Sequence, residues 1–344
     1  MPMDEKLHFA GFSDQLLDWY AASARDLPWR IGPFDRAQGV MPDPYRVWMA
    51  EIMLQQTTVP HATRYFLAFT ERWPTVEDLA AADDADVMGA WAGLGYYARA
   101  RNLLKCAREV ASMGAWPDTV EGLRALPGIG PYTAGAIGAL AFGRRAAAVD
   151  GNVDRVFARL MALKGDWKTE KVRLKSVVEG LVPEDRPAEF AEGLMDLGAT
   201  ICTPKSPNCL ICPVRSFCKA QAEWAPERYP IKPKKTPKPH RVGHVYVLRG
   251  PDRTVLTETR PERGLLGGMM GLPTSDWSDA LTDPKFPYQA NWQDVGEVRH
   301  VFTHFSLTLT VWQADGDGAF ADTPIKTAAD HLPSVFAKAL KLAL

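Results

Sequence analysis

Four of the chain's five cysteines lie within one short segment, spaced as Cys202-x6-Cys209-x2-Cys212-x5-Cys218. Four soft thiolates so close in sequence can wrap one compact metal centre. Clustering of a scarce residue is not a packing pattern, so four unrelated buried thiols explain it poorly. The spacing alone leaves zinc and an iron-sulfur cluster open. The fifth cysteine, Cys106, lies in a helical pattern and is expected to be a buried thiol.

Two acidic residues stand where their surroundings should give them opposite properties. Glu51 lies in the run 47–57, which is apolar nearly all round in its first two turns and is expected to be a buried helix. Burial should raise the pKa of Glu51 toward the range of a general acid. Asp150 precedes a helix, whose N-terminus would keep the carboxylate ionised to face a developing cation. The alternatives are a structural carboxylate at Glu51 and an ordinary helix cap at Asp150.

The segment 126–133 has the sequence LPGIGPYT and predicts a tight turn leading into a helix, with Pro131 at the first helical position. Gly128 and Gly130 would let the backbone approach a ligand closely. The N–H groups at the start of the helix, that of Thr133 included, suit a phosphate. A plain helix-helix turn is the alternative, and binding of the DNA backbone is favoured.

The hairpin, Asp150 and the cysteine spacing together resemble the endonuclease III superfamily of DNA glycosylases. Within it, EIMLQQT at 51–57 and GLGYYARARNL at 93–103 closely resemble the MutY family of adenine DNA glycosylases, and the match covers almost the whole chain. The resemblance, and not the spacing, implies a [4Fe-4S] cluster on the four cysteines. It also implies base excision repair on double-stranded DNA with adenine opposite 8-oxoguanine or guanine.

The resemblance assigns roles to individual residues. Glu51 would protonate adenine and later handle water, and Asp150 would stabilise or trap the sugar oxocarbenium ion, as in retaining glycosidases. Bifunctional relatives carry a lysine two residues after the hairpin's second glycine, where this chain has Tyr132, so a monofunctional enzyme is expected. The residues matched to the pocket for extruded adenine, or to the space beside the lesion, are Arg25, Trp29, Leu54, Gln56, Thr57, Leu94, Tyr96, Tyr132, Asn152 and Glu192. For Trp29 and Tyr96, a place in the hydrophobic core is the alternative.

The C-terminal part resembles the Nudix-like lesion-sensing domain of the same family. Phe302, Thr303 and His304 match its lesion-probing loop and directly precede an alternating strand pattern at 305–311. We therefore expect them on a loop end, where recognition residues are commonly placed.

Two features of the chain depart from the family's or the domain's pattern. The segment 264–273 fits a Nudix domain, but no glutamate lies between Glu262 and Glu297, so metal-dependent Nudix hydrolysis is not expected. The segment 31–43 is longer and richer in glycine and proline than the family shows, and the sequence assigns it no role.

Periodicity predicts the elements that must position these residues. The expected architecture is a mainly α N-terminal domain at 1–225, a Pro/Lys-rich linker at 226–241 and an α+β domain at 242–344. Helices are expected at 13–20, 45–57, 75–82, 86–92, 98–112, 133–142, 153–163, 171–181 and 187–202. The second domain should contain strands at 244–248 and 254–257 and a closing helix at 333–342.

Charge is distributed unevenly along the 344 residues. Forty basic and 41 acidic residues give a net charge of −1, so no overall positive field attracts a polyanion. Residues 199–241 carry nine basic and two acidic residues, whereas residues 271–344 carry five and nine. DNA binding should therefore be polarised toward the cysteine loop and linker.

No apolar leader begins the chain, and the longest uncharged run, 125–143, holds two prolines and five glycines, so no membrane span is predicted. A cytoplasmic monomer is expected, and its protein partners are unknown. The rival hypotheses are an endonuclease III-like bifunctional glycosylase/AP lyase and a non-catalytic iron-sulfur DNA-binding protein.

Overall fold

The computed structural model describes residues 3–231, 237–261, 264–316 and 322–344. The chain forms two compact units, Met1–Lys234 and Lys235–Leu344, and each is described by itself. The predicted limits at 225 and 242 stay a prediction. Part of the predicted linker (232–236) and Glu262 lie outside the described residues. No helix in the described part of the chain is long and apolar enough to cross a membrane.

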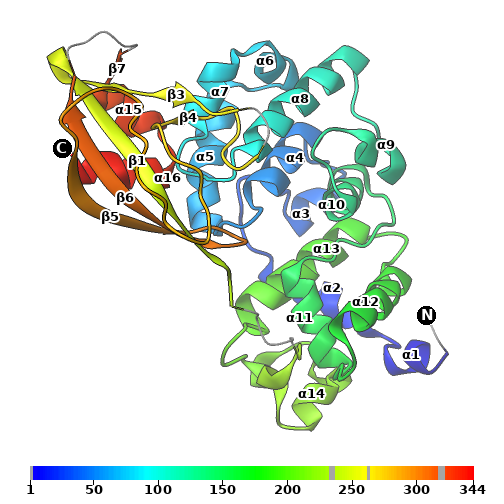
Figure 1. The fold of residues 1–344 in the computed structure, drawn as a ribbon. Helices are drawn as coiled ribbons and strands as arrows, with labels where there is room; N and C mark the ends of the chain where they lie inside the picture. Colours follow the sequence, from blue (N-terminus) through cyan, green and yellow to red (C-terminus); the bar gives the residue numbers. More distant parts are fainter. Residues whose placement is uncertain (1–2, 232–236, 262–263, 317–321) are drawn as a thin grey trace. The chain divides into compact units, whose positions relative to one another are not determined.

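The first unit is helical throughout (Figure 1). Short turns of π-helix (Leu197–Ile201) and 3₁₀-helix (Cys209–Ile211, Arg215–Phe217, Pro226–Arg228) accompany its α-helices. The α-helices are α1 (Met3–His8), α2 (Phe12–Ser23), α3 (Pro33–Ala37), α4 (Pro44–Met53), α5 (Val59–Arg72), α6 (Val76–Ala81), α7 (Asp84–Ala90), α8 (Ala98–Met113), α9 (Val120–Ala125), α10 (Pro131–Phe142), α11 (Gly151–Leu160), α12 (Trp167–Leu181), α13 (Pro187–Asp196) and α14 (Lys219–Ala222).

Each predicted helix overlaps an observed one, but five end earlier than expected, two of them by four residues or more. The helix predicted at 45–57 stops at Met53, because Gln56 adopts a left-handed φ of 57° that a helix cannot contain. The helix predicted at 187–202 stops at Asp196 and continues as a π-helical turn, in which the Cys202 N–H donates to the Leu197 carbonyl. The long helix α5 was not predicted; its Pro60 lies in the first turn, where a helix tolerates proline.

Two hydrophobic cores lie side by side in this unit. One is built on α4, α5, α8 and α10 and contains the fully buried Trp48 and Trp91. The other is built on α2, α11, α12 and α13 and contains Phe157 and Phe190. Helix α13 contributes residues to both cores, so it joins the two halves of the unit.

The approach of α10 to the segment that leads into Asp150 depends on one glycine. A Cβ on Gly135, in the middle of α10, would lie 2.6 Å from the Ala147 carbonyl oxygen. Because no real Cβ comes so close to a backbone atom, only glycine lets the helix pack here. Tyr132, at the start of α10, lies three residues before Gly135, and Asp150 lies three residues after Ala147.

We therefore predict that Gly135→Ala destabilises the first unit by about 1–3 kcal/mol, although alanine has the better helix propensity, because overpacking outweighs propensity here. Urea unfolding followed by tryptophan fluorescence measures the change. Gly32→Ala is the matched control, since Gly32 has an ordinary φ of −65° and a Cβ there would meet nothing within 4 Å. Equal stability of the two variants would contradict the role of this contact.

The second unit is α+β, as predicted (Figure 1). A five-stranded sheet has the order β5-β6-β1-β2-β7, in which β1 and β6 are parallel and the other neighbours antiparallel. Two helices follow the last strand, and α16 lies against β1 and β5. The elements are β1 (His240–Gly250), β2 (Thr254–Leu256), β3 (Glu258–Thr259), β4 (Met270–Gly271), β5 (Gln293–Val301), β6 (Ser306–Asp315), β7 (Asp322–Pro324), α15 (Ile325–His331) and α16 (Ser334–Leu342).

Each strand and helix predicted in this unit overlaps an observed element. The alternating pattern at 305–311 lies largely in β6, where Leu307, Leu309 and Val311 are buried. Strand β5 was not predicted. It is an exposed edge strand with a bulge between Asp294 and Glu297, so it lacks a regular alternation.

Candidate active site

A cavity of about 330 Å³ in the first unit is lined by residues of α4, α10, α11 and α13 and of the loops beside them. Both halves of the unit supply its walls, which include the two predicted catalytic carboxylates, Glu51 and Asp150. The other predicted residues that line it are Arg25, Trp29, Leu54, Gln56, Thr57, Tyr132, Asn152 and Glu192. Ten of the predicted site residues thus share one cavity. Residues that the sequence did not select also line it, among them Arg30, Gln55, Leu140 and Met195.

Glu51 is the buried acid of this cavity. It lies near the end of α4 and is only 6% exposed. Burial raises its pKa to about 7, and the negative charge of Asp150 acts in the same direction, whereas a hydrogen bond from the Tyr132 hydroxyl lowers it. The expected elevation of the Glu51 pKa is therefore found, with desolvation as the main cause. Burial beside Glu51 also raises the pKa of Tyr132 well above its usual value, so the phenol remains a hydrogen-bond donor.

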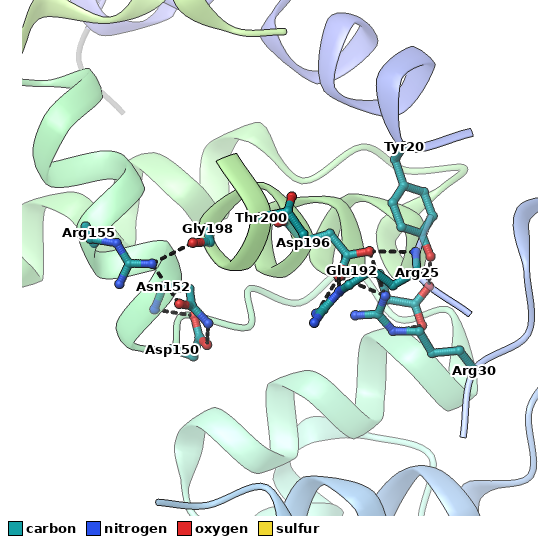
Figure 2. Close-up of polar contacts among 10 residues, drawn as sticks. All are labelled: Tyr20, Arg25, Arg30, Asp150, Asn152, Arg155, Glu192, Asp196, Gly198 and Thr200. Carbon is teal, nitrogen blue, oxygen red and sulfur yellow. Dashed lines mark hydrogen bonds and ion pairs between the residues drawn. The ribbon is translucent and has the colours of Figure 1, made fainter. Parts of the chain in front are cut away.

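Asp150 is the N-cap of α11 and also faces the cavity. Its Oδ1 accepts the backbone N–H groups of Asn152 (2.9 Å) and Val153 (2.8 Å), and its Oδ2 accepts the Asn152 side-chain amide at 2.9 Å. Arg155 in turn donates to the Asn152 side chain at 2.8 Å and to the Gly198 carbonyl at 2.7 Å (Figure 2). The capping interpretation is therefore confirmed, and the catalytic role stays a prediction that is compatible with it, because the cap keeps a carboxylate at the cavity wall.

At one wall of the cavity, two acidic residues of α13, Glu192 and Asp196, interact with arginines (Figure 2). Asp196 is fully buried and accepts from the Arg25 Nε at 2.7 Å and from the Arg30 Nη1 at 2.9 Å. The Tyr20 hydroxyl donates to the Glu192 Oε2 at 2.6 Å. A buried charge is stable only when it is paired in this way. Arg30, which sequence reasoning missed, directly follows Trp29, and that adjacency was its only signal.

Gln56 and Tyr96 were matched to the space beside the lesion, and both are exposed residues with a left-handed φ, of 57° and 51°. Such strain in residues other than glycine is typical of functional sites. Arg99 holds their two loops together, since its guanidinium donates to the Gln55 carbonyl at 2.7 Å and to the Leu94 carbonyl at 3.1 Å. Leu94 itself is buried, so its place is in the hydrophobic core beneath the Tyr96 loop.

The hairpin before α10 has the expected backbone. Gly128 has a φ of 76°, and a Cβ there would lie 2.8 Å from the Asn102 Cβ, so only glycine fits. Gly130 caps α10 without any side-chain hydrogen bond to the first N–H groups. The Thr133 side chain is buried and accepts from the Gln55 amide at 3.5 Å, so a phosphate contact there would have to come from the backbone.

The four clustered cysteines line a second cavity, between α11 and the loop 202–218, and none is in a disulfide. Arg159 is 1% exposed, and its Nη1 donates to the Cys202 Sγ at 3.3 Å and to the Thr203 carbonyl at 2.7 Å. A buried cation beside four free thiols suits a centre with thiolate ligands. The donor set therefore fits an iron-sulfur cluster.

In the second unit, Phe302, Thr303 and His304 lie in the loop between β5 and β6, as expected. Phe302 is half-buried and stacks on Trp277 with ring centroids 5.9 Å apart. Thr303 and His304 are exposed. Two of the three side chains are therefore free to contact a ligand, while the phenylalanine anchors the loop.

Comparisons with known proteins agree with this architecture. Residues 49–179 match the HhH-GPD superfamily of base excision DNA repair proteins, residues 202–218 the iron-sulfur binding domain of endonuclease III, and residues 244–341 the NUDIX domain. The chain is 34% identical to human adenine DNA glycosylase, over 92% of this chain and 68% of the human protein. It is 37% identical to the adenine DNA glycosylase of Buchnera aphidicola subsp. Acyrthosiphon pisum, over 69% of this chain and 67% of that protein.

Among solved structures, a thermostable thymine-DNA glycosylase is similar with a TM-score of 0.55 and 29% identity, over 63% of this chain and 98% of that one. An endonuclease III–DNA complex shares the fold with a TM-score of 0.52 and 22% identity, over 65% of this chain and 99% of that one. The predicted fold class is thus confirmed. The iron-sulfur match also assigns the cysteine loop to an iron-sulfur cluster. From its site, its domain matches and its relatives, the chain belongs to the adenine DNA glycosylase family, a family of base excision repair enzymes.

Proposed function

We propose that the protein is a monofunctional glycosylase that removes adenine paired with 8-oxoguanine or guanine in double-stranded DNA. The observation that carries the proposal is the pairing in one cavity of a buried Glu51, whose pKa is raised to about 7, with the capped carboxylate of Asp150. Two carboxyl groups in such different surroundings can act as an acid and as a fixed anion. A single-turnover base-release assay on mismatched duplexes tests the function directly.

In the proposed mechanism, adenine leaves the base stack and enters the cavity, because the glycosidic bond is inaccessible inside the duplex. Glu51 donates its proton to the base, which makes adenine a better leaving group. As the bond breaks, positive charge develops on the sugar, and the Asp150 carboxylate stabilises it or traps it covalently. Glu51, now a carboxylate, accepts a proton from the water that completes hydrolysis. Atoms and charges balance without any other reactant.

Tyr132 supports the monofunctional assignment. A lyase needs an amine at this position to form an imine with the opened sugar. Here a phenol lies against Glu51, and its raised pKa keeps it protonated. It would orient the acid and supply no nucleophile. The same assay therefore separates the three hypotheses, since a lyase would also cut the strand and a non-catalytic binder would release no base.

For the cofactor we propose a [4Fe-4S] cluster held by Cys202, Cys209, Cys212 and Cys218. The match of residues 202–218 to the iron-sulfur binding domain of endonuclease III supports this proposal. When bound, the cluster would crosslink the four thiolates and so organise the loop 202–218.

DNA phosphate would be held by the hairpin before α10, through Gly128, Gly130 and the Thr133 N–H. The enzyme would act as a monomer.

The first prediction concerns pH and Glu51. An acid with a raised pKa is protonated below that pKa and loses its proton above it, so base release should slow as pH rises through about 7. Below about pH 7, Glu51→Gln should still bind the mismatch yet release adenine about 10²–10⁴-fold more slowly, and its rate should not show this fall as pH rises. Rapid-quench kinetics with enzyme in excess of DNA measures both. A variant with wild-type rates would remove Glu51 from the mechanism.

The second prediction concerns the cluster. Purified protein should be brown, with broad visible absorbance and iron in clear excess over zinc, because a [4Fe-4S] centre has these properties and zinc has none. Elemental analysis by mass spectrometry checks it. A colourless, active protein with one zinc per chain is the contrary result.

The third prediction concerns lesion recognition. The excised adenine is the same opposite 8-oxoguanine and opposite guanine, so discrimination must come from contacts to the opposite base. Replacing Thr303 and His304 together by alanine should reduce the selectivity between the two pairs by roughly 1–3 kcal/mol. The catalytic step should survive, since Glu51 and Asp150 lie in the other unit. Selectivity is the ratio of single-turnover rates on the two duplexes, and an unchanged ratio would mean that this loop does not recognise the lesion.

A further inference from the structure

The segment 31–43, to which the sequence assigns no role, reaches the wall of the adenine cavity. It contains the short helix α3, on which most residues are exposed. Pro33 is half-buried, and the Arg36 side chain is only 8% exposed. An exposed insertion that buries one guanidinium uses it for a specific contact, because a long cationic side chain is rarely buried without a partner.

Arg36 makes contacts with two elements of the site. Its Nη1 donates to the Leu140 carbonyl at 3.3 Å, near the C-terminus of α10, where helix carbonyls lack partners within the helix and attract cations. Its Nη2 lies 3.5 Å from the Glu192 Oε1 on α13. Within the part of the chain that the structure describes, this buried Nη2 makes an ion pair but no hydrogen bond, so it is directed at Glu192.

Glu192 depends on the Arg36 guanidinium as the second cation beside it. Tyr20 already donates to its Oε2 at 2.6 Å. Its Oε1 faces the Nε of Arg30 at 3.7 Å, but Arg30 donates its Nη1 to Asp196. Without Arg36, the 2%-exposed Glu192 would keep only the more distant of its two cations. A buried carboxylate that loses a cation becomes mobile or takes up a proton.

We propose that Arg36 is a positioning residue that fixes Glu192 as the acceptor for the exocyclic amino group of the extruded adenine. The proposal rests on the proposed function. Glu192 lines the cavity, and the amino group is the only hydrogen-bond donor on the base edge of adenine. A fixed carboxylate there distinguishes adenine from a base that lacks this donor. Arg36 acts only through Glu192, so the insertion belongs to the specificity of the site.

The test compares adenine with purine, which lacks the amino group, each placed opposite 8-oxoguanine. Arg36→Met should slow adenine release roughly 10-fold or more, the scale of one charge-assisted contact, and slow purine release by less than about 3-fold. Arg36→Lys should recover most of the adenine rate, because it restores the charge facing Glu192. In a Glu192→Gln background, Arg36→Met should have no further effect. Gln38→Met, at an exposed position of the same segment, is the control and should match wild type on both bases.

The outcomes separate the inference from the function. If wild type releases adenine but Arg36→Met slows both bases equally, or slows neither, the positioning role is wrong and the function stands. An additive effect of Arg36→Met in the Glu192→Gln background also overturns it. If wild-type protein with its iron bound releases no adenine, the proposed function fails, and the inference fails with it. Circular dichroism and iron content confirm that each variant is folded.

Discussion

The desolvation of Glu51 is the constraint on which the rest of the site depends. A rise of its pKa from 4.5 to about 7 corresponds to about 3 kcal/mol in favour of the neutral acid. Among the residues that the structure describes, no guanidinium forms an ion pair with Glu51; its hydrogen-bond partner is the neutral phenol of Tyr132. The apolar faces of α4 and α10 thus raise the pKa of Glu51 by excluding water from it. Gly135 allows α10 to pack close to the segment that leads into Asp150.

Other buried charged residues of the first unit are compensated by hydrogen-bond donors or by cations, so they do not cancel the raised pKa of Glu51. Asp196 forms ion pairs with Arg25 and Arg30. Glu192 accepts a hydrogen bond from Tyr20 and lies beside the guanidinium groups of Arg30 and Arg36. Asp150 is held by backbone N–H groups at a helix N-terminus. Asp196, Glu192 and Asp150 therefore each have their own donors, whereas the protonation of Glu51 is set mainly by desolvation. The difference in surroundings is what lets neighbouring carboxyl groups take opposite protonation states at one pH.

Sequence reasoning found the residues whose type and spacing carry a local signal. Glu51 in an apolar run, Asp150 before a helix and the clustered cysteines all lie where the sequence predicts. It missed residues whose role depends on tertiary contacts. Arg36 looks like any charged residue of a polar loop, and only the fold brings it to α10 and α13. Arg99 lies in the matched segment 93–103, but the sequence alone does not show that its side chain contacts two separate loops.

The same distinction explains which helix ends were wrong. Local patterns extend α4 to Thr57, but the chain leaves the helix after Met53 and places Gln56 in a strained conformation. Tyr96 is strained in the same way, and Arg99 ties both loops to one guanidinium. Helix propensity cannot predict such turns, because tertiary hydrogen bonds offset their cost. Gln56 and Tyr96, the two exposed residues matched to the space beside the lesion, are thus among the positions where local rules fail, and strain would serve function there.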